Sequence, residues 1–169
     1  MPIFDLLDTV LPPEGRYCVI GIGPYVDQKF FDTKQEVEEQ AAKLVKGRFN
    51  VYFGCAKYGL LNNRRQENAD YFRAIWLDID CGPEKGVPDE KGIIKGYLTQ
   101  EIGLTELKKF CQATALPRPI LVSSGYGIHA YWLLNETISR TNWNPLSERL
   151  RELCAEQGLI VDPSVFEAA

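Results

Sequence analysis

The sequence predicts an α+β fold in which mixed, mostly antiparallel sheets are flanked by helices. Two observations carry this prediction. Short apolar runs rich in β-branched residues, such as 17–22, alternate with longer segments whose apolar residues recur at helical spacing. Both kinds of connection also occur, because a tight turn at 124–127 joins two runs as a hairpin and helical segments join others as crossovers.

Each expected element has a local signal. Thr33 and Glu36 have the spacing of a capping box at a helix N-terminus, and Gly47 marks the end of that helix. Prolines and glycines mark most of the other boundaries. The expected strands are 17–22, 49–55, 72–80, 120–123, 128–134 and 159–163, and the expected helices are 33–46, 105–116 and 143–157.

Length and composition fit one globular domain that covers residues 1–169. Hydrophobic residues make up 45% of the chain and charged residues 25%, an ordinary balance for a folded protein. No apolar run approaches the roughly 20 residues that span a bilayer, and the amino end lacks the pattern of a signal peptide. We therefore expect no membrane partner and a cytoplasmic location.

The cysteines and the net charge argue against two classes of protein. Five cysteines are scattered and histidine occurs once, so the chain has no zinc-finger spacing, and we expect reduced thiols and no zinc. The net charge of −4 argues against a protein that coats nucleic acid without specificity, although a local basic channel is compatible with it.

Asp78 and Asp80 are the centre of the candidate site. An apolar run from Ala74 to Leu77 predicts a buried strand, which then ends in D-I-D. Side chains alternate along a strand, so the two carboxylates share one face while Ile79 points into the core. Ionised carboxylates side by side repel each other, and a divalent cation such as Mg²⁺ or Mn²⁺ removes that repulsion. The alternative is a pair of solvated carboxylates at a strand end.

A second motif, S-S-G-Y-G-I-H, begins at Ser123 and joins two expected strands. Gly125 and Gly127 allow a tight turn and a close approach of the backbone to a ligand. Backbone N–H groups and the hydroxyls of Ser123 and Ser124 can form an anion-binding concavity. His129 follows the turn and can donate a hydrogen bond to a phosphate oxygen. The alternative is a plain hairpin followed by a core histidine.

Asp162 ends the last expected strand, within V-D-P. An aspartate before a proline is often only the start of a turn. Together with Asp78, Asp80 and the phosphate-holding turn, however, it would complete a two-metal site for phosphoryl transfer.

Loops on either side of the central strand supply further candidates. The polar loop 56–69 carries basic residues that could hold phosphates or simply form a solvated surface: Lys57, Arg64 and Arg65. The loop 83–96 is rich in glycine, proline and charge, and is expected to be mobile beside the site. Three tyrosines could stack on bases or be buried in the core: Tyr58, Tyr71 and Tyr126.

The order of these motifs resembles that of the archaeo-eukaryotic primase superfamily, and within it the primase-polymerases of phages and plasmids. D-I-D, S-S-G-Y-G-I-H-A-Y-W and V-D-P carry the resemblance, which extends from about Tyr17 to Asp162. It implies a primase core that contains an RRM-like unit. Many members have Ser-x-His in the second motif, whereas Gly127 stands at the serine position here, so a hydroxyl would have to come from Ser123 or Ser124.

The resemblance implies a nucleotidyltransferase, a DNA primase and DNA polymerase that synthesises and extends primers on single-stranded DNA from nucleoside triphosphates. By the same resemblance, two Mg²⁺ or Mn²⁺ ions would be bound by Asp78, Asp80 and Asp162, and His129 would contact the triphosphate. The other residues expected to bind nucleotide are Ser123, Ser124, Gly125, Gly127, Lys57, Arg64 and Arg65. A longer replication protein, with a helicase domain in the same chain, is also compatible with the resemblance.

Two other functions are compatible with the same residues. A metal-dependent glycosyltransferase acting on sugar nucleotides also uses a D-x-D pair, although it needs neither the glycine-rich turn nor a third carboxylate. A replication-initiator or other nucleic-acid-binding module would use a similar sheet without catalysis. A D-x-D-x-T phosphatase is disfavoured, because Gly82 stands where the threonine would be.

Overall fold

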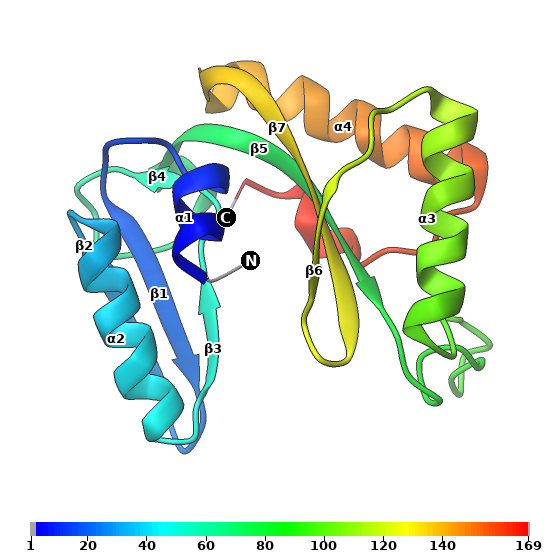
Figure 1. Ribbon diagram of the computed structural model, residues 1–169, viewed down its shortest axis with the longest axis horizontal. Coiled ribbons are helices and arrows are strands. Elements are labelled where there is room, and N and C mark those ends of the chain that lie inside the picture. The colour runs from blue at the N-terminus through cyan, green and yellow to red at the C-terminus, as the bar shows by residue number, and fades with distance from the viewer. Residues whose placement is uncertain (1–2, 169) are drawn as a thin grey trace. The chain divides into compact units, whose positions relative to one another are not determined.

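Two long strands, β5 (Ala69–Asp80) and β7 (Gly127–Ser139), contribute to both of the units into which the chain divides (Figure 1). The computed structural model describes residues 3–168. The first unit comprises the chain up to residue 74 with 134–143 and 168, and the second comprises 75–133 and 144–167. The second unit contains the three carboxylates and the histidine that are expected to be catalytic: Asp78, Asp80, Asp162 and His129.

The first unit contains a three-stranded antiparallel sheet with the order β2-β1-β3. Helix α2 packs against it through its buried apolar side chains, such as Val37 and Leu44. The capping box predicted for this helix is present, because Thr33 Oγ1 accepts a hydrogen bond from Glu36 N at 3.2 Å and Glu36 Oε2 accepts one from Thr33 N at 3.2 Å. The elements of this unit are α1 (Ile3–Val10), β1 (Tyr17–Ile22), β2 (Val26–Phe31), α2 (Lys34–Lys46), β3 (Asn50–Phe53), β4 (Lys57–Tyr58) and a 3₁₀ turn (Gln66–Asn68).

The second unit is built on one end of a four-stranded sheet with the order β4-β5-β7-β6. Strand β6 (Ile120–Ser123) is antiparallel to β7, with Val122 opposite His129. Strand β7 therefore lies between β5 and β6, which are joined through helix α3 (Gln100–Thr114), and this arrangement is a split β-α-β unit. The α+β fold with mostly antiparallel strands and flanking helices is confirmed.

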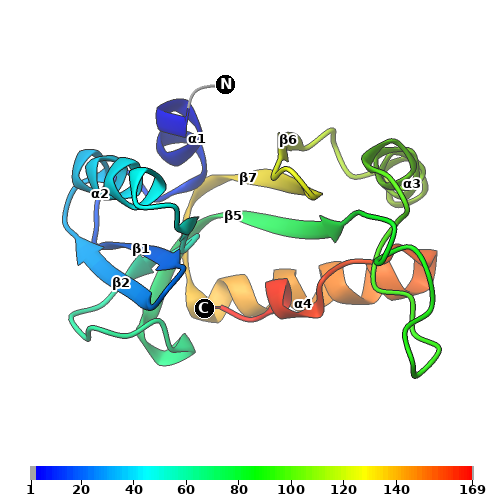
Figure 2. The same ribbon diagram turned by 90° about the horizontal axis from the view of Figure 1, so that it is seen from below.

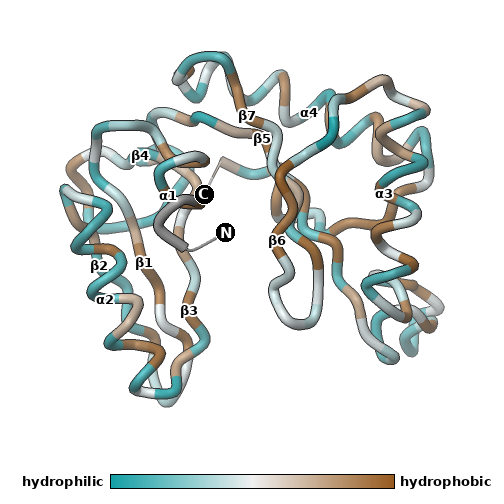
Figure 3. Tube along the Cα trace, viewed as in Figure 1, coloured by the Kyte–Doolittle hydropathy of each residue, from teal (hydrophilic) through white to brown (hydrophobic). Residues whose placement is uncertain are grey.

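One face of β5 and β7 forms the core of this unit. Helix α3 and helix α4 (Arg140–Gln157) pack on that face, and Figure 2 shows α4 lying along the strands. Hydrophobic residues of β6 appear brown in Figure 3, and Leu121 packs against the same core. The buried side chains that make up the core come from every other position of the strands and from both helices: Leu77, Ile79, Ile128, Ala130, Trp132, Leu107, Phe110, Leu150 and Cys154. The intervening residues of β5 and β7 consequently point to the opposite face.

Several boundaries differ from the prediction. Helix α3 begins at Gln100, ahead of Thr105, because Thr99 supplies the N-cap and accepts a hydrogen bond from Ile102 N. Strand β2 was not predicted, since its sequence, V-D-Q-K-F-F, has no apolar alternation and forms an exposed edge. Helix α1, strand β4 and the 3₁₀ turn in the polar loop were not predicted either.

The prediction of a last strand at 159–163 is wrong. The chain there forms no strand, and a 3₁₀ turn (Pro163–Phe166) follows Asp162. Proline has no N–H group with which to continue a ladder, so the segment makes isolated contacts instead. Asp162 N donates to Asp78 O at 2.9 Å, and Ile160 N donates to the Tyr97 hydroxyl at 3.0 Å.

Two further predictions from the sequence concern membrane-spanning segments and the cysteine thiols. Within residues 3–168, no helix is both long enough and apolar enough to cross a membrane. The five cysteines are free thiols in the structure, and three of them are buried: Cys18, Cys81 and Cys154.

Candidate active site

Asp78 and Asp80 lie on the same face at the end of β5. Their side chains are 33% and 32% exposed, whereas the neighbouring Leu77 and Ile79 are fully buried. The strand alternation expected from the sequence is therefore present, and both carboxylates are accessible to a ligand.

His129 lies on the adjacent strand, β7, and faces the first of these carboxylates. Its Nε2 atom is 3.6 Å from Asp78 Oδ1, and its Nδ1 atom is 3.4 Å from the Tyr131 hydroxyl. The imidazole is 30% exposed. A core histidine held by backbone groups, the alternative interpretation of the sequence, does not fit this exposure and these side-chain neighbours.

Asp162 reaches the same strand end without belonging to the sheet. Its backbone N–H is hydrogen-bonded to the carbonyl oxygen of Asp78. Its side chain caps the following 3₁₀ turn, since Oδ1 accepts a hydrogen bond from Ser164 N at 2.8 Å. The structure thus brings together the three carboxylates and the histidine that the sequence selected.

The electrostatics of Asp78 show how close these groups are. Burial is the main cause that raises the pKa of the Asp78 carboxyl above its usual value, and the negative charges of Asp80 and Asp162 raise it further. The positive charges that oppose this shift come from His129 and Lys85. Ionised carboxylates therefore repel one another at this strand end.

The carboxylates of Asp78, Asp80 and Asp162 offer oxygen ligands to a divalent cation. Their oxygens are the hard donors that Mg²⁺ and Mn²⁺ prefer, so the chemistry of the side chains fits such ions. Across residues 3–168, however, no three His, Cys, Asp or Glu side chains converge as ligands of one ion. Lys85 is bonded to one of them, with Nζ at 2.7 Å from Asp80 Oδ2. A metal ion on Asp80 would have to take the place of this ammonium group.

The turn between β6 and β7 is held by a side chain that the sequence did not single out. Gln100 Nε2 donates to Ser123 Oγ at 3.1 Å and to the carbonyl oxygens of Gly125 and Gly127 at 3.2 and 3.1 Å. Ser124 N donates to Gly127 O at 3.1 Å, so this amide is already used within the turn. Of the two serines, Ser123 is the one whose hydroxyl is bonded to Gln100.

Gly125 and Gly127 are glycines for different physical reasons. Gly125 has a φ of +95°, with open space around it. A Cβ atom at Gly127 would lie 2.7 Å from the carbonyl oxygen of Ile79, so the close approach of β7 to β5 excludes a side chain there. This contact favours glycine at the position where the resembling motif has serine. A bulky substitution at Gly127 would strain the strand pair, and its effect would say nothing about phosphate.

The basic residues expected to bind nucleotide belong to the first unit. Lys57 Nζ lies 5.4 Å from the centroid of the Tyr71 ring, and Arg65 is exposed and 3.9 Å from Glu67. Arg64 is exposed as well. Their contact with a nucleotide stays a prediction. Tyr58 is buried, which excludes it from base stacking, whereas Tyr126 is 84% exposed in the turn of the second unit.

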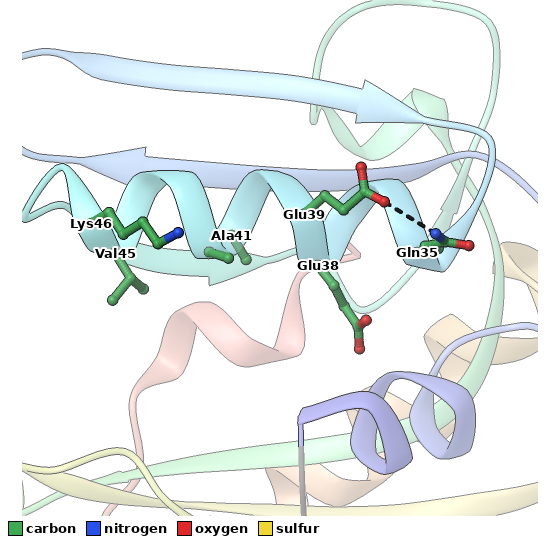
Figure 4. A pocket seen from close by; sticks show the side chains of 7 residues that line it. Gln35, Glu38, Glu39, Ala41, Val45 and Lys46 are labelled. Carbon is green, nitrogen blue, oxygen red and sulfur yellow. Dashed lines mark hydrogen bonds between the residues drawn. The ribbon is translucent and has the colours of Figure 1, made fainter.

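A cavity of about 700 Å³ lies against α2 in the first unit (Figure 4). Within residues 3–168, both carboxylate oxygens of Glu38 are buried without a hydrogen-bond partner, and burial is the main cause that raises the pKa of this carboxyl. Figure 4 shows Glu38 and Val45 projecting from the same side of the helix. The cavity contains none of the predicted site residues, and the residues lining it are Gln35, Glu38, Glu39, Ala41, Ala42, Val45 and Lys46.

Comparison with known proteins bears on the fold. No protein-family model matches the sequence, and no curated protein matches it. Among solved structures, the chain is similar to the AEP domain of the primase-polymerase (PrimPol) of cyanophage S-2L, with a TM-score of 0.52 and 21% sequence identity. The match covers 83% of this chain and 65% of that one. The chain therefore has the fold of an archaeo-eukaryotic primase domain, as the motifs predicted.

The raised pKa of Asp78, which is caused first by burial and then by the neighbouring carboxylates, leads to a prediction about stability. Replacing Asp78 by Asn should raise the melting temperature in EDTA at pH 7 by about 2–4 °C, which corresponds to about 1 kcal/mol. The raised pKa means that ionised Asp78 destabilises the folded state. The difference from the unmodified protein should therefore be absent near pH 3 and should grow as pH rises above about 4, the unfolded-state pKa.

Asp89→Asn is the matched control for this measurement. Hydrogen bonds from Lys95 and from the backbone N–H groups of Ile93 and Lys91 lower the pKa of Asp89 to about 2, so its charge stabilises the fold. Its replacement should lower the melting temperature at pH 7. If Asp78→Asn also lowers it, the carboxylates are not in conflict.

Proposed function

We propose that the chain is the catalytic domain of a template-dependent nucleotidyltransferase, a DNA primase-polymerase that synthesises and extends primers. One observation carries the proposal. Asp78 and Asp80 on β5, His129 on β7 and Asp162 beside β5 meet at one strand end of a primase-type fold. Phosphoryl transfer through two divalent cations needs such a group of carboxylates next to a donor for phosphate.

In the proposed reaction, the 3′-hydroxyl of a primer or of a first nucleotide attacks the α-phosphorus of an incoming nucleoside triphosphate. A new P–O bond forms to the hydroxyl oxygen, the bond to the β-phosphate oxygen breaks, and pyrophosphate leaves. The side chains of Asp78, Asp80 and Asp162 would hold two Mg²⁺ or Mn²⁺ ions. When bound, such ions activate the attacking hydroxyl and stabilise the leaving pyrophosphate.

The residues beside the carboxylates would position the triphosphate. His129 Nε2 lies at the accessible end of β7 and would donate a hydrogen bond to a phosphate oxygen, which stabilises charge on the triphosphate. We assign the hydroxyl contact of the second motif to Ser124, because Ser123 is engaged by Gln100. Gly125 has no side chain and open space surrounds it, so this position would not obstruct an approaching nucleotide.

Contacts to the template and further contacts to the nucleotide are assigned to Tyr126 and to three basic residues. Tyr126, which is almost fully exposed, would stack on a base of single-stranded DNA. Lys57, Arg64 and Arg65 would contact phosphates of the nucleotide or the template, which supplies a local positive region in a chain of net charge −4. We place this activity in the cytoplasm, which for a phage protein is the cytoplasm of the host cell. We also propose that the chain is part of a longer replication protein.

The proposal predicts metal-dependent incorporation of labelled nucleotide on a primed single-stranded DNA template. Asp80→Asn should reduce the incorporation rate by at least about 100-fold, because the variant loses a carboxylate ligand next to the reacting phosphate. Asp89→Asn, in the following loop, should retain the rate. A glycosyltransferase or a non-catalytic module would give no incorporation with the unmodified chain, and full activity of Asp80→Asn would contradict the site.

His129 provides a separate prediction. His129→Ala should lower kcat/KM for the nucleotide by about 10–100-fold, the range expected for a lost hydrogen bond to a charged group. Mn²⁺ affinity measured without nucleotide should be unchanged, because the carboxylates remain. Tyr131→Phe is the control, since it removes only the hydroxyl 3.4 Å from Nδ1. An unchanged kcat/KM in His129→Ala would return this histidine to a structural role.

A further inference from the structure

The loop that follows β5 (residues 83–96) has a defined course. Figure 1 shows it in green between β5 and α3. At its base, Gly82 N donates to Tyr97 O at 2.8 Å and Tyr97 N donates to Asp80 O at 2.9 Å. Hydrogen bonds from Lys85 N to Gly82 O at 3.0 Å and from Lys95 N to Lys85 O at 3.2 Å fix the backbone of Lys85. The loop therefore holds one lysine at the edge of the site.

The side chain of Lys85 is directed at a site carboxylate. Its Nζ atom lies 2.7 Å from Asp80 Oδ2, and the two side chains are 35% and 32% exposed. Its charge also acts on Asp78, and Asp162 acts on Lys85. Lys85 is thus close enough to all three carboxylates for its charge to offset part of their repulsion.

A divalent cation and this ammonium group compete for the same oxygen. Two cations beside one carboxylate repel each other, so an ion that binds Asp80 Oδ2 should displace Lys85. The divalent ion has the larger charge and gains several oxygen ligands, whereas the lysine loses its hydrogen bond to Asp80. The lysine side chain is long and flexible while its backbone is fixed, so its ammonium group can move to another anion nearby.

The anion that fits is a phosphate of the incoming nucleotide. In the proposed reaction the triphosphate lies against the metal ions, within reach of a lysine that has just left Asp80. Lysine binds phosphate as a compact point charge with three donors.

We propose that Lys85 is a nucleotide-binding residue that neutralises Asp80 before a metal binds and transfers to a phosphate of the nucleotide when a divalent cation replaces it. This inference rests on the proposed function. Lys85 would then offset part of the repulsion among the carboxylates when no metal is present, and would contribute to catalysis only after the metal has bound.

The test compares Lys85→Met with Lys95→Met, which removes a lysine of the same loop that pairs with Asp89 at 2.9 Å instead. Mn²⁺ affinity is measured by electron paramagnetic resonance without nucleotide. Affinity for a non-hydrolysable nucleoside triphosphate is then measured by calorimetry at saturating Mn²⁺. Melting curves confirm that each variant is folded, and Lys85→Arg keeps the charge.

The proposal predicts shifts of opposite sign. Lys85→Met should bind Mn²⁺ about threefold more tightly, because the competing ammonium group is gone. It should bind the nucleotide about tenfold more weakly, because a charge-assisted hydrogen bond is lost. Lys95→Met should leave both affinities unchanged, and Lys85→Arg should restore most of the nucleotide affinity.

Two other results overturn the inference. Equal affinities in Lys85→Met and Lys95→Met would show that Lys85 takes part in neither step. A loss of both Mn²⁺ and nucleotide affinity in Lys85→Met would show that the lysine holds the loop in place and does not exchange with the metal. If the unmodified protein binds neither Mn²⁺ nor nucleotide, the proposed function fails as well, and this outcome is distinct from the other two.

Discussion

Mutual repulsion among three carboxylates is the constraint on which the rest of the site depends. Asp78, Asp80 and Asp162 are close enough for their charges to raise the pKa of the Asp78 carboxyl beyond the effect of burial. The fold tolerates this repulsion because the imidazole of His129 lies against Asp78 and the ammonium group of Lys85 lies against Asp80. A site that opposes its own ionisation in this way favours a divalent cation, which removes the conflict.

The fold fixes these charges through backbone contacts and the core. Alternate residues of β5 and β7 are buried against α3 and α4, which directs the charged residues to the opposite face. Gly127 allows β7 to approach the carbonyl oxygen of Ile79, so His129 comes next to Asp78. Asp162 depends on one hydrogen bond from its own backbone to β5. The glycine and this bond are therefore as important for the site as its charged groups.

Local patterns predicted much of the fold, and non-local contacts explain what they did not predict. The capping box at Thr33 and the D-I-D strand are local signals, and both features are present. The polar edge strand β2 has no such signal, because its pairing with β1 creates it. Asp78, Asp80 and His129 could be selected as polar groups at strand ends, and Asp162 was selected at the end of a strand that does not form. Lys85 and Gln100 could not be selected in this way. Their roles come from the return of a loop and from the N-terminal end of α3.

The most direct test of the account is the position of Mn²⁺ in a crystal of the protein soaked with Mn²⁺ and a non-hydrolysable nucleoside triphosphate. Anomalous scattering identifies the metal without reference to any assumed ligand. The account predicts two peaks about 3.5–4 Å apart at the carboxylates of Asp78, Asp80 and Asp162, with the nucleotide phosphates bound to them. Clear density for the nucleotide with no Mn²⁺ peak at these carboxylates, and with Lys85 still on Asp80, would contradict it.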